Sequence, residues 1–208
     1  DAIILQDIGM ARLIKRELPD FEIHASTQMV AHSLEDVLYL QNIGFDRVVL
    51  ARELSLKEIK EISLSDSDVE LEAFIHGAMC ISYSGRCLLS NYMTGRNSNE
   101  GDCAQSCRWK YHLVEEKRPG EYMPVFENER GTFIYNSKDL CMIEHIPEMM
   151  ESGIDSFKVE GRMKTALYVA TVARTYRMAI NDYKKSPDYY RERIPFYKSE
   201  IAKCTYRQ

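Results

Sequence analysis

Residues 47–76, RVVLARELSLKEIKEISLSDSDVELEAFIH, decide the fold. A short apolar run, Arg47–Ala51, is followed by a stretch with helical periodicity and then by a second apolar run, Val69–His76. Ser55 and Glu58 have the spacing of a capping box, so a helix is predicted to begin just after this serine. A strand, a helix and a second strand in this order predict a βαβ unit with parallel strands.

The same alternation extends toward the N-terminus. Further apolar runs occur at Ala2–Leu5 and Glu22–Ser26, so that the four runs begin 20, 25 and 22 residues apart. Pro19 and Gly44 stand where the intervening helices should end. Because this period carries no leucine-rich consensus, it indicates βα units and not a solenoid.

Residues 77–131 interrupt the pattern with a segment rich in Gly, Ser, Asn, Cys and Arg, and the βα pattern then resumes. The elements predicted after this segment are a strand at Thr132–Asn136, a helix at Ser137–Ser152, a strand at Ser156–Glu160, a long amphipathic helix at Thr165–Tyr183, and a further helix past Pro187.

Six predicted strands in βα order indicate an α/β fold. A closed (β/α)₈ barrel has eight strands and about 250 residues. We therefore expect a partial (β/α)8 TIM-like barrel lacking its first units, with a Cys-rich inserted loop region over 77–131. Residues 1–183 would form the C-terminal part of the barrel, and 184–208 a basic-aromatic C-terminal segment. A smaller open α/β sheet is the alternative. For the partial barrel, the missing N-terminal units or a second copy of the chain would be partners.

Composition limits the function. The 208 residues are 45% hydrophobic and 28% charged, with a net charge of −5, which is typical of a soluble globular protein and disfavours a general DNA- or membrane-coating role. No apolar run is long enough to span a membrane, and no signal peptide is visible, so we expect a cytoplasmic protein without a membrane partner. Residues 1–79 hold 7 Lys and Arg against 15 Asp and Glu, so an anionic partner should meet the rest of the chain.

Polar residues follow the ends of the predicted strands, where parallel α/β folds gather their functional groups. Any one of them could instead be a helix cap or a surface residue. The residues singled out there are Ser26, Gln28, Arg52, Glu53, Glu72, His76, Lys158, Glu160 and Arg162.

Four cysteines crowd into 28 residues: Cys80, Cys87, Cys103 and Cys107. Such clustering favours a thiolate metal site over scattered buried thiols or disulfides. Only the pair Cys103 and Cys107 has zinc-ribbon spacing, whereas wider spacing suits an Fe–S cluster. Other chemistries are disfavoured, because zinc-protease, nucleophile-elbow, Rossmann and P-loop motifs are all absent from the sequence. A nucleophilic pair of Cys80 and His76 stays open.

The stretch EAFIHGAMC at 72–80, followed by GRCLLS at 85–90, resembles the signature of the collagenase-like peptidase family, peptidase family U32. Five further blocks also resemble the family: HASTQ at 24–28, REL at 52–54, CAQSCRW at 103–109, NSKDL at 136–140 and KVEGRMK at 158–164. The resemblance covers roughly residues 1 to 185, and members carry further βα units before the position of Asp1.

This resemblance implies an RNA hydroxylase more than a protease. Members hydroxylate the wobble uridine of tRNA, a base of ribosomal RNA or a quinone precursor, and several hold a [4Fe–4S] cluster on these cysteines. The RNA-hydroxylating members depend on prephenate metabolism, so a prephenate-derived co-substrate is implied. CAQSCRW and the stretch RPGEY at 118–122 look most like the tRNA branch.

We therefore expect Cys80, Cys87, Cys103 and Cys107 to bind the cluster, with Cys141 as the substitute ligand and zinc as an aerobic replacement. His76 and Glu72 would move protons, with Glu160 and Arg162 beside them in the catalytic group. Arg162 and Arg86 would orient a phosphate or carboxylate. The predicted substrate-binding residues are Ser26, Gln28, Arg52, Glu53, Arg86 and Lys158.

Residues 184–208 carry 7 Lys and Arg against 3 Asp and Glu, interleaved with Tyr and Phe, which suits an RNA loop. A packed amphipathic helix with a solvated face is the alternative for this tail. Two other functions compete with the hydroxylase: a peptidase that uses a Cys/His or metal site, and a non-enzymatic metal module that docks a partner.

Overall fold

The computed structural model describes residues 1–65, 67–109, 111–124 and 139–204. By its internal contacts the chain divides into two compact units. Unit 1 consists of Asp1–Ala78 and Asp139–Gln208, and unit 2 consists of Met79–Lys138. The sheet belongs to unit 1, and the four clustered cysteines belong to unit 2.

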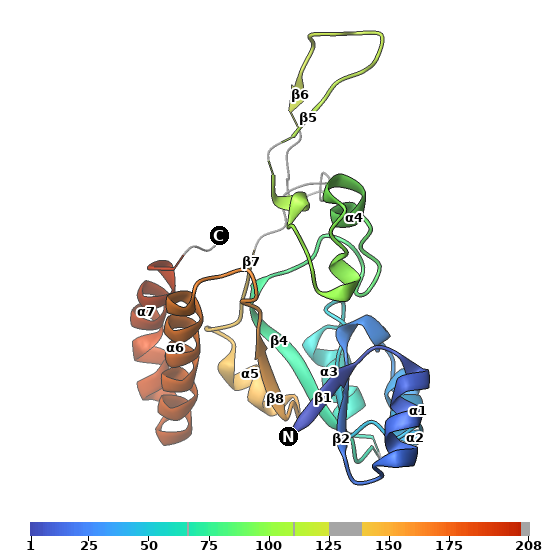
Figure 1. Cartoon of the computed structure of the whole chain (residues 1–208). Coiled ribbons are helices and arrows are strands. Elements are labelled where there is room, and N and C mark those ends of the chain that lie inside the picture. Colours follow the sequence, from blue (N-terminus) through green and yellow to red (C-terminus); the bar gives the residue numbers. More distant parts are fainter. Residues whose placement is uncertain (66, 110, 125–138, 205–208) are drawn as a thin grey trace. The chain divides into compact units, whose positions relative to one another are not determined.

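Unit 1 alternates strands and helices along the chain, as the sequence predicted (Figure 1). Its elements in order are β1 (Ala2–Leu5), α1 (Ile8–Glu17), β2 (Glu22–Ala25), the 3₁₀ turn η1 (Thr27–Met29), α2 (Leu34–Asn42), β3 (Arg47–Val49), α3 (Leu56–Ser63), β4 (Glu70–Ala78), β7 (Asp139–Cys141), α5 (Ile146–Glu151), β8 (Ser156–Val159), α6 (Ala166–Lys185) and α7 (Pro187–Ala202).

Strands β1, β2, β3 and β4 pair in parallel in that order, and β8 also pairs in parallel with β4. The parallel α/β architecture is therefore confirmed. In the described part of the chain the strand order does not close into a ring, so the barrel stays a prediction. Parallel strands place their C-terminal ends at one edge of the sheet, which is where functional groups of such folds gather.

Short polar side chains set where the helices begin. Asp7, Ser33 and Thr165 accept hydrogen bonds from backbone amides in the first turns of α1, α2 and α6. The predicted capping box is present at α3, where Ser55 and Glu58 satisfy each other's backbone amides. These caps satisfy amide groups that would otherwise lack a partner at a helix start.

The two faces of the sheet differ in chemistry because successive strand residues point to opposite sides. Ile23, Val48, Leu71 and Ile75 lie on the face that is buried in the hydrophobic core together with residues of the helices. The other face carries charged residues, among them Glu72, which helps to form the site described below.

Helices α6 and α7 pack side by side (Figure 1). Tyr190 and Tyr197 of α7 are fully buried, whereas Tyr189 and Phe196 lie partly exposed on its other side. The tail is therefore the packed amphipathic helix that was the alternative reading, at least over Pro187–Ala202.

The predicted helix Ser137–Ser152 is wrong over its described first part. Residues Asp139–Cys141 form β7, which pairs antiparallel with the end of β4, and helix α5 begins only at Ile146. Pairing with β4 overrides the local helical pattern, and Pro147 near the helix start fixes where α5 begins. The predicted strand Thr132–Asn136 lies outside the described residues.

Unit 2 is built from short elements. They are α4 (Leu89–Thr94), the 3₁₀ turns η2 (Ser98–Glu100) and η3 (Ser106–Arg108), and the antiparallel pair β5 (His112–Leu113) and β6 (Met123–Pro124). Turn η3 packs against α4, and Ser90 of α4 accepts a hydrogen bond of 2.9 Å from the amide of Ala104.

No helix within the described residues has the length and apolar character needed to cross a membrane.

Candidate active site and thiol group

His76 lies near the C-terminal end of β4 and is completely buried. Its Nδ1 atom is 3.3 Å from the hydroxyl oxygen of Tyr176, and the centroids of the two rings are 5.5 Å apart. On another side, the Tyr168 ring centroid is 6.1 Å from that of His76. Two tyrosines of α6 therefore hold the imidazole at the end of β4.

Burial lowers the pKa of His76 to about 4, with the positive charge of Lys164 adding to this effect and the negative charge of Asp139 opposing it. Lys164 lies 4.0 Å from the carboxylate of Asp139, whose side chain is fully buried. His76 is therefore a neutral imidazole at neutral pH. In this state it can accept a proton but has none to spare as an acid.

Glu72 lies four residues before His76 on β4. Its carboxylate contacts side chains of the two neighbouring strands, β8 and β3. Lys158 of β8 donates a hydrogen bond of 2.8 Å to it, and Ser156 donates one of 2.7 Å. Arg47 of β3 lies 3.6 Å away on the opposite side. The predicted residues Glu72 and Lys158 are thus brought together, while Arg47 and Ser156 are partners that the sequence analysis missed.

The pKa of Glu72 is lowered by these partners. Burial alone would raise the pKa, but the hydrogen bonds from Lys158 and Ser156 and the charges of Lys158 and Arg47 outweigh burial. Glu72 is therefore an ionised carboxylate at neutral pH, suited to fix Lys158 in place. The catalytic role assigned to Glu72 stays a prediction.

Glu160 directly follows β8 and meets the end of β4 through its backbone. Its amide donates a hydrogen bond of 2.8 Å to the carbonyl of His76, and a Cβ atom placed on Gly77 would lie only 2.3 Å from the Glu160 carbonyl oxygen. The Glu160 carboxylate accepts a hydrogen bond of 2.9 Å from the amide of Arg162. Of the predicted catalytic residues, Glu160 therefore contacts both His76 and Arg162.

The remaining predicted residues of unit 1 follow β2 and β3. Ser26 caps η1 and donates a hydrogen bond of 3.1 Å to the amide oxygen of Gln28. Arg52 is half-buried and Glu53 exposed in the turn after β3. Ser26 therefore has a capping role in the structure, and the substrate contacts of all four residues stay predictions.

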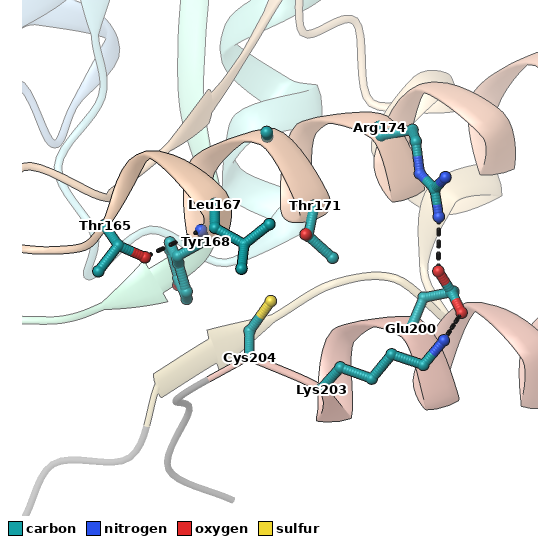
Figure 2. A pocket seen from close by; sticks show the side chains of 9 residues that line it. Thr165, Leu167, Tyr168, Thr171, Arg174, Glu200, Lys203 and Cys204 are labelled. Atoms are coloured by element: carbon teal, nitrogen blue, oxygen red, sulfur yellow. Dashed lines mark hydrogen bonds and ion pairs between the residues drawn. The ribbon is translucent and has the colours of Figure 1, made fainter.

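A cavity of about 500 Å³ opens between the start of α6 and the end of α7 (Figure 2). Thr165, Tyr168 and Cys204 line it, and Figure 2 shows the Cys204 sulfur directed toward α6. The two cations at its wall, Arg174 and Lys203, are both paired with Glu200. Tyr168 also packs on His76, so this cavity borders one of the two tyrosines that hold the imidazole.

The four clustered cysteines all lie in unit 2, three of them around α4 and η3. Cys87 precedes α4, Cys107 lies within η3, and both are buried. The Cys103 sulfur accepts a hydrogen bond of 3.3 Å from the amide of Gln105, a residue with φ of 54°. Arg86 is exposed next to Cys87, and Cys141 belongs to unit 1, where it pairs with His76 in the sheet.

Electrostatics couples three of these thiols. Burial raises the pKa of Cys107, and the charges of Cys103 and Cys87 raise it further, against the opposing amide of Ile81 and the charge of Arg108. Burial would also raise the pKa of Cys87, but hydrogen bonds from Ser98, Ser82 and the amides of Leu89 and Ser90 lower it to about 7. Donors that stabilise a thiolate also favour metal binding by that thiolate.

Within the described ranges, no three His, Cys, Asp or Glu side chains are arranged so that they could hold a metal ion. The donor chemistry of the cysteines thus fits a thiolate-bound centre, but the described thiols form no preassembled site and would have to rearrange to share one.

Sequence reasoning missed Tyr176, Asp139 and Lys164 around His76. Tyr176 falls within the predicted helix Thr165–Tyr183, where its hydroxyl group gave no separate signal. Arg47 and Ser156 did carry a signal, because each is a charged or polar residue at the start of a predicted strand, where it can pair with a residue of the neighbouring strand.

The family model described as peptidase family U32 matches residues 1–208. "tRNA hydroxylation protein P1" of Bacillus subtilis (strain 168) is 47% identical, with 89% of this chain and 44% of that protein covered. "tRNA hydroxylation protein P" of Escherichia coli (strain K12) is 40% identical, with 88% and 49% covered. A 23S rRNA 5-hydroxycytidine synthase of Escherichia coli (strain K12) is 38% identical, with 87% and 26% covered.

This chain spans about half the length of the first two of these relatives, or less. No solved structure matches it.

Proposed function

The chain belongs to peptidase family U32, and we propose that it acts in the hydroxylation of an RNA base, with the wobble uridine of tRNA as its target. The observation that carries this proposal is its 40 to 47% identity to proteins named for tRNA hydroxylation. The similarity to an rRNA hydroxycytidine synthase supports the same reaction class on a second kind of RNA. Such an enzyme would work in the cytoplasm.

The arrangement around His76 supports a proton-accepting role in this reaction. Hydroxylation replaces a C–H bond of the base by a C–OH bond, so a proton leaves the base and the base gives up two electrons. The electrons pass either to a separate acceptor, with water supplying the oxygen, or to the oxygen donor itself. At neutral pH His76 is unprotonated, so it has a ring nitrogen that can take that proton. We propose His76 as this base, with Glu160 and Arg162 next to it, and Arg162 and Arg86 as contacts to a phosphate or to the carboxylate of a prephenate-derived co-substrate.

Glu72 and Lys158 would hold the substrate on the polar face of the sheet. Lys158 is kept in position by the carboxylate of Glu72 and lies 5.6 Å from the centroid of the Phe74 ring. A positioned ammonium group next to an aromatic ring suits a phosphate and its nucleoside. Ser26, Gln28, Arg52 and Glu53, at the ends of the neighbouring strands, would complete the binding surface.

We further propose that Cys80, Cys87, Cys103 and Cys107 hold a [4Fe–4S] cluster, with Cys141 as a substitute ligand and zinc as the metal found after exposure to air. The donor set of thiolates and the hydrogen bonds to Cys87 and Cys103 support this assignment. When bound, such a cluster would supply electron transfer. Arg108, which lies next to Cys107, would offset part of the negative charge of the thiolates.

Nucleoside analysis tests the activity. The chain would be expressed in a bacterium deleted for its own tRNA hydroxylase, and the tRNA digested and analysed by mass spectrometry. A uridine heavier by one oxygen at the wobble position is expected. If wild-type chain that retains metal restores no hydroxylated base in tRNA or rRNA, the proposed function is wrong.

Iron and sulfide analysis after anaerobic purification tests the cluster. Cys87→Ser and Cys107→Ser should lower bound iron and the visible absorption together, while Cys204→Ser, which changes a thiol of unit 1, should leave both unchanged. Iron content that is the same in all three variants would exclude these ligands.

The peptidase alternative is weakened by the state of His76. A thiol protease uses a protonated imidazole to stabilise the attacking thiolate, and a histidine with a pKa of about 4 holds no such proton at neutral pH. Peptide cleavage by the metal-free chain that is abolished by a thiol alkylator would nevertheless favour the peptidase.

A further inference from the structure

Unit 2 exposes aromatic side chains near its thiols. Tyr92 on α4 is 85% exposed, and Trp109, which directly follows η3, is 46% exposed. Because η3 packs against α4, both residues belong to the same small assembly that carries Cys87 and Cys107. Large exposed aromatic groups on a well-packed scaffold are typical of a binding surface.

Trp109 belongs to a rigid pair of rings. The Trp109 and Tyr111 rings are stacked, with centroids 6.3 Å apart and planes inclined by 25°. The carbonyl oxygen of Ser106 ties them together, since it accepts a hydrogen bond of 3.1 Å from the Trp109 amide and one of 2.9 Å from the Tyr111 hydroxyl. The Trp109 backbone and the tip of the Tyr111 ring are therefore anchored to the same carbonyl oxygen, which keeps the two rings together.

Such a pair offers a preorganised flat surface. The indole keeps nearly half of its surface open to solvent while its neighbour holds it in place. Proteins that bind single-stranded nucleic acid stack unpaired bases on aromatic faces of this kind, and the stacking tolerates every base. Rigid aromatic anchors lose little conformational entropy on binding, which increases the gain in affinity.

The aromatic residues of the C-terminal tail are the other candidates for RNA contact, and their rings are less accessible. In the C-terminal tail, Tyr190 and Tyr197 are fully buried in the core of unit 1. The guanidinium of Arg193 stacks over Tyr189, Phe196 and Tyr197 and also binds Asp182, so the exposed rings of the tail are already covered on one side by the chain's own cation.

We propose that the Trp109 ring, supported by Tyr111, is a stacking platform for an unpaired base of the RNA substrate. This inference rests on the proposed RNA-hydroxylase function and assigns one contact of it. The platform gives affinity for an unstacked loop and not for a duplex, because bases within a helix have no free face to offer.

Tryptophan fluorescence measures this contact directly, since Trp109 is the only tryptophan of the chain. The probe is a synthetic anticodon stem-loop RNA with uridine at the wobble position, and the comparison is the same stem closed as a duplex without a loop. Stacking on the indole should quench its emission with the stem-loop and leave it nearly unchanged with the duplex.

Three variants then separate stacking from charge and from folding. Trp109→Leu should weaken stem-loop binding by at least about fivefold, because one stacked base contributes about 1 kcal/mol or more. Its affinity should fall with salt at the wild-type slope, since no phosphate contact is removed. Trp109→Phe keeps a ring and should bind within about twofold of the wild type, and Tyr39→Leu, an exposed aromatic of α2 in unit 1, should bind like the wild type.

Unchanged stem-loop affinity in Trp109→Leu, or equal quenching by stem-loop and duplex, would overturn the proposal. A variant that binds RNA normally but changes its elution volume on size exclusion would identify the platform as a protein contact instead, which also overturns it. Failure here is distinguishable from failure of the proposed function: hydroxylated tRNA made equally by wild type and Trp109→Leu removes the platform and leaves the hydroxylase standing.

Discussion

The hydroxyl group of Tyr176 on α6 connects His76 to the backbone of β4 and of Met142, the residue that follows β7. It lies 2.9 Å from the carbonyl oxygen of Ile75 and 3.3 Å from Nδ1 of His76, and it accepts a hydrogen bond of 2.9 Å from the amide of Met142. A phenol has one hydrogen to donate, and the nearer acceptor is the Ile75 carbonyl. Nδ1 of His76 is then the donor to the phenol oxygen, which leaves Nε2 as the basic nitrogen.

Tyr176→Phe should therefore reduce hydroxylation by more than its loss of folded protein explains. The substitution removes the phenol bonds to the Met142 amide and the Ile75 carbonyl, which keep a direct hydrogen bond of 3.0 Å to each other, so it should cost about 1 kcal/mol. It also frees the imidazole to change tautomer. Urea denaturation and nucleoside analysis below the unfolding range would measure both effects.

Tyr190→Phe is the matched control, because Tyr190 is equally buried and donates a hydrogen bond of 2.8 Å to the carbonyl of Ile143. The Tyr190→Phe variant should be less stable than the wild type, but its folded fraction should keep its turnover. Equal turnover in the two variants at matched folded fraction would show that Tyr176 has only a structural role.

Acid should destabilise unit 1 through His76. Its pKa is about 4 in the folded state and 6.5 when unfolded, so below about pH 6.5 the unfolded chain takes up a proton that the folded chain does not. The free energy of unfolding should consequently fall by about 2 kcal/mol between about pH 7 and about pH 5, and the loss should level off below the folded pKa.

His76→Gln should remove this part of the pH dependence while other groups keep theirs. Urea midpoints of wild type and variant at several pH values would give the two slopes. Parallel slopes would mean that His76 does not remain neutral in the folded protein.

Replacing Lys158, the cation bound to Glu72, should lower the free energy of unfolding more than neutralising the Glu72 carboxylate does. Lys158→Met leaves a mostly buried carboxylate with fewer partners and should lower stability by about 1–3 kcal/mol, whereas Glu72→Gln keeps hydrogen-bonding capacity and should cost less. Denaturant unfolding of both variants and of the double variant would give the coupling energy.

Glu70→Gln provides the comparison for this pair, because Glu70 also binds a cation, Arg47, but its side chain is half exposed. Its change should stay below about 1 kcal/mol. If Glu70→Gln lowers stability as much as Lys158→Met, the buried ion pairs are not centred on Glu72.

Gly77→Ala should disrupt the junction between β4 and Glu160. The glycine has a φ of 110°, which side chains rarely adopt, and a Cβ atom would lie 2.3 Å from the Glu160 carbonyl oxygen. We expect a loss of at least about 2 kcal/mol.

Gly95→Ala is the corresponding control, since Gly95 also has positive φ, at 73°, but nothing lies within 4 Å of a Cβ there. It should cost only about 1–2 kcal/mol, the penalty of the left-handed conformation itself. Thermal unfolding of the two variants would rank their losses of stability. A smaller loss for Gly77→Ala than for Gly95→Ala would show that the end of β4 and the Glu160 backbone separate easily.

Local signals were sufficient for most of unit 1. Helix α6 spans Ala166–Lys185 where the apolar stripe predicted Thr165–Tyr183, and the capping box at Ser55 is present as expected. Both depend on residues within one helix or its cap. Strand β7 was missed because its only support is pairing with Ala78, Gly77 and His76, more than 60 residues earlier in the chain.

The candidate site was predictable in position but not in its supporting contacts. Parallel topology alone places His76 and Glu160 at one edge of the sheet, so their identification needed no structure. The Tyr176 contact joins residues 100 positions apart and depends on how α6 packs on β4. No pattern within either segment encodes that distance, and the same holds for the pairing of Lys164 with Asp139.

The two buried tyrosines of α7 set a limit on how the C-terminus can vary. Tyr190 and Tyr197 stack with centroids 5.9 Å apart, and both fill the core beneath α6. A stop codon just after Lys185 would strip these rings from the helix that holds His76, so loss of catalysis would come from collapse of the scaffold and not from a lost RNA contact. Truncation of this chain should therefore be tolerated only beyond Ile201.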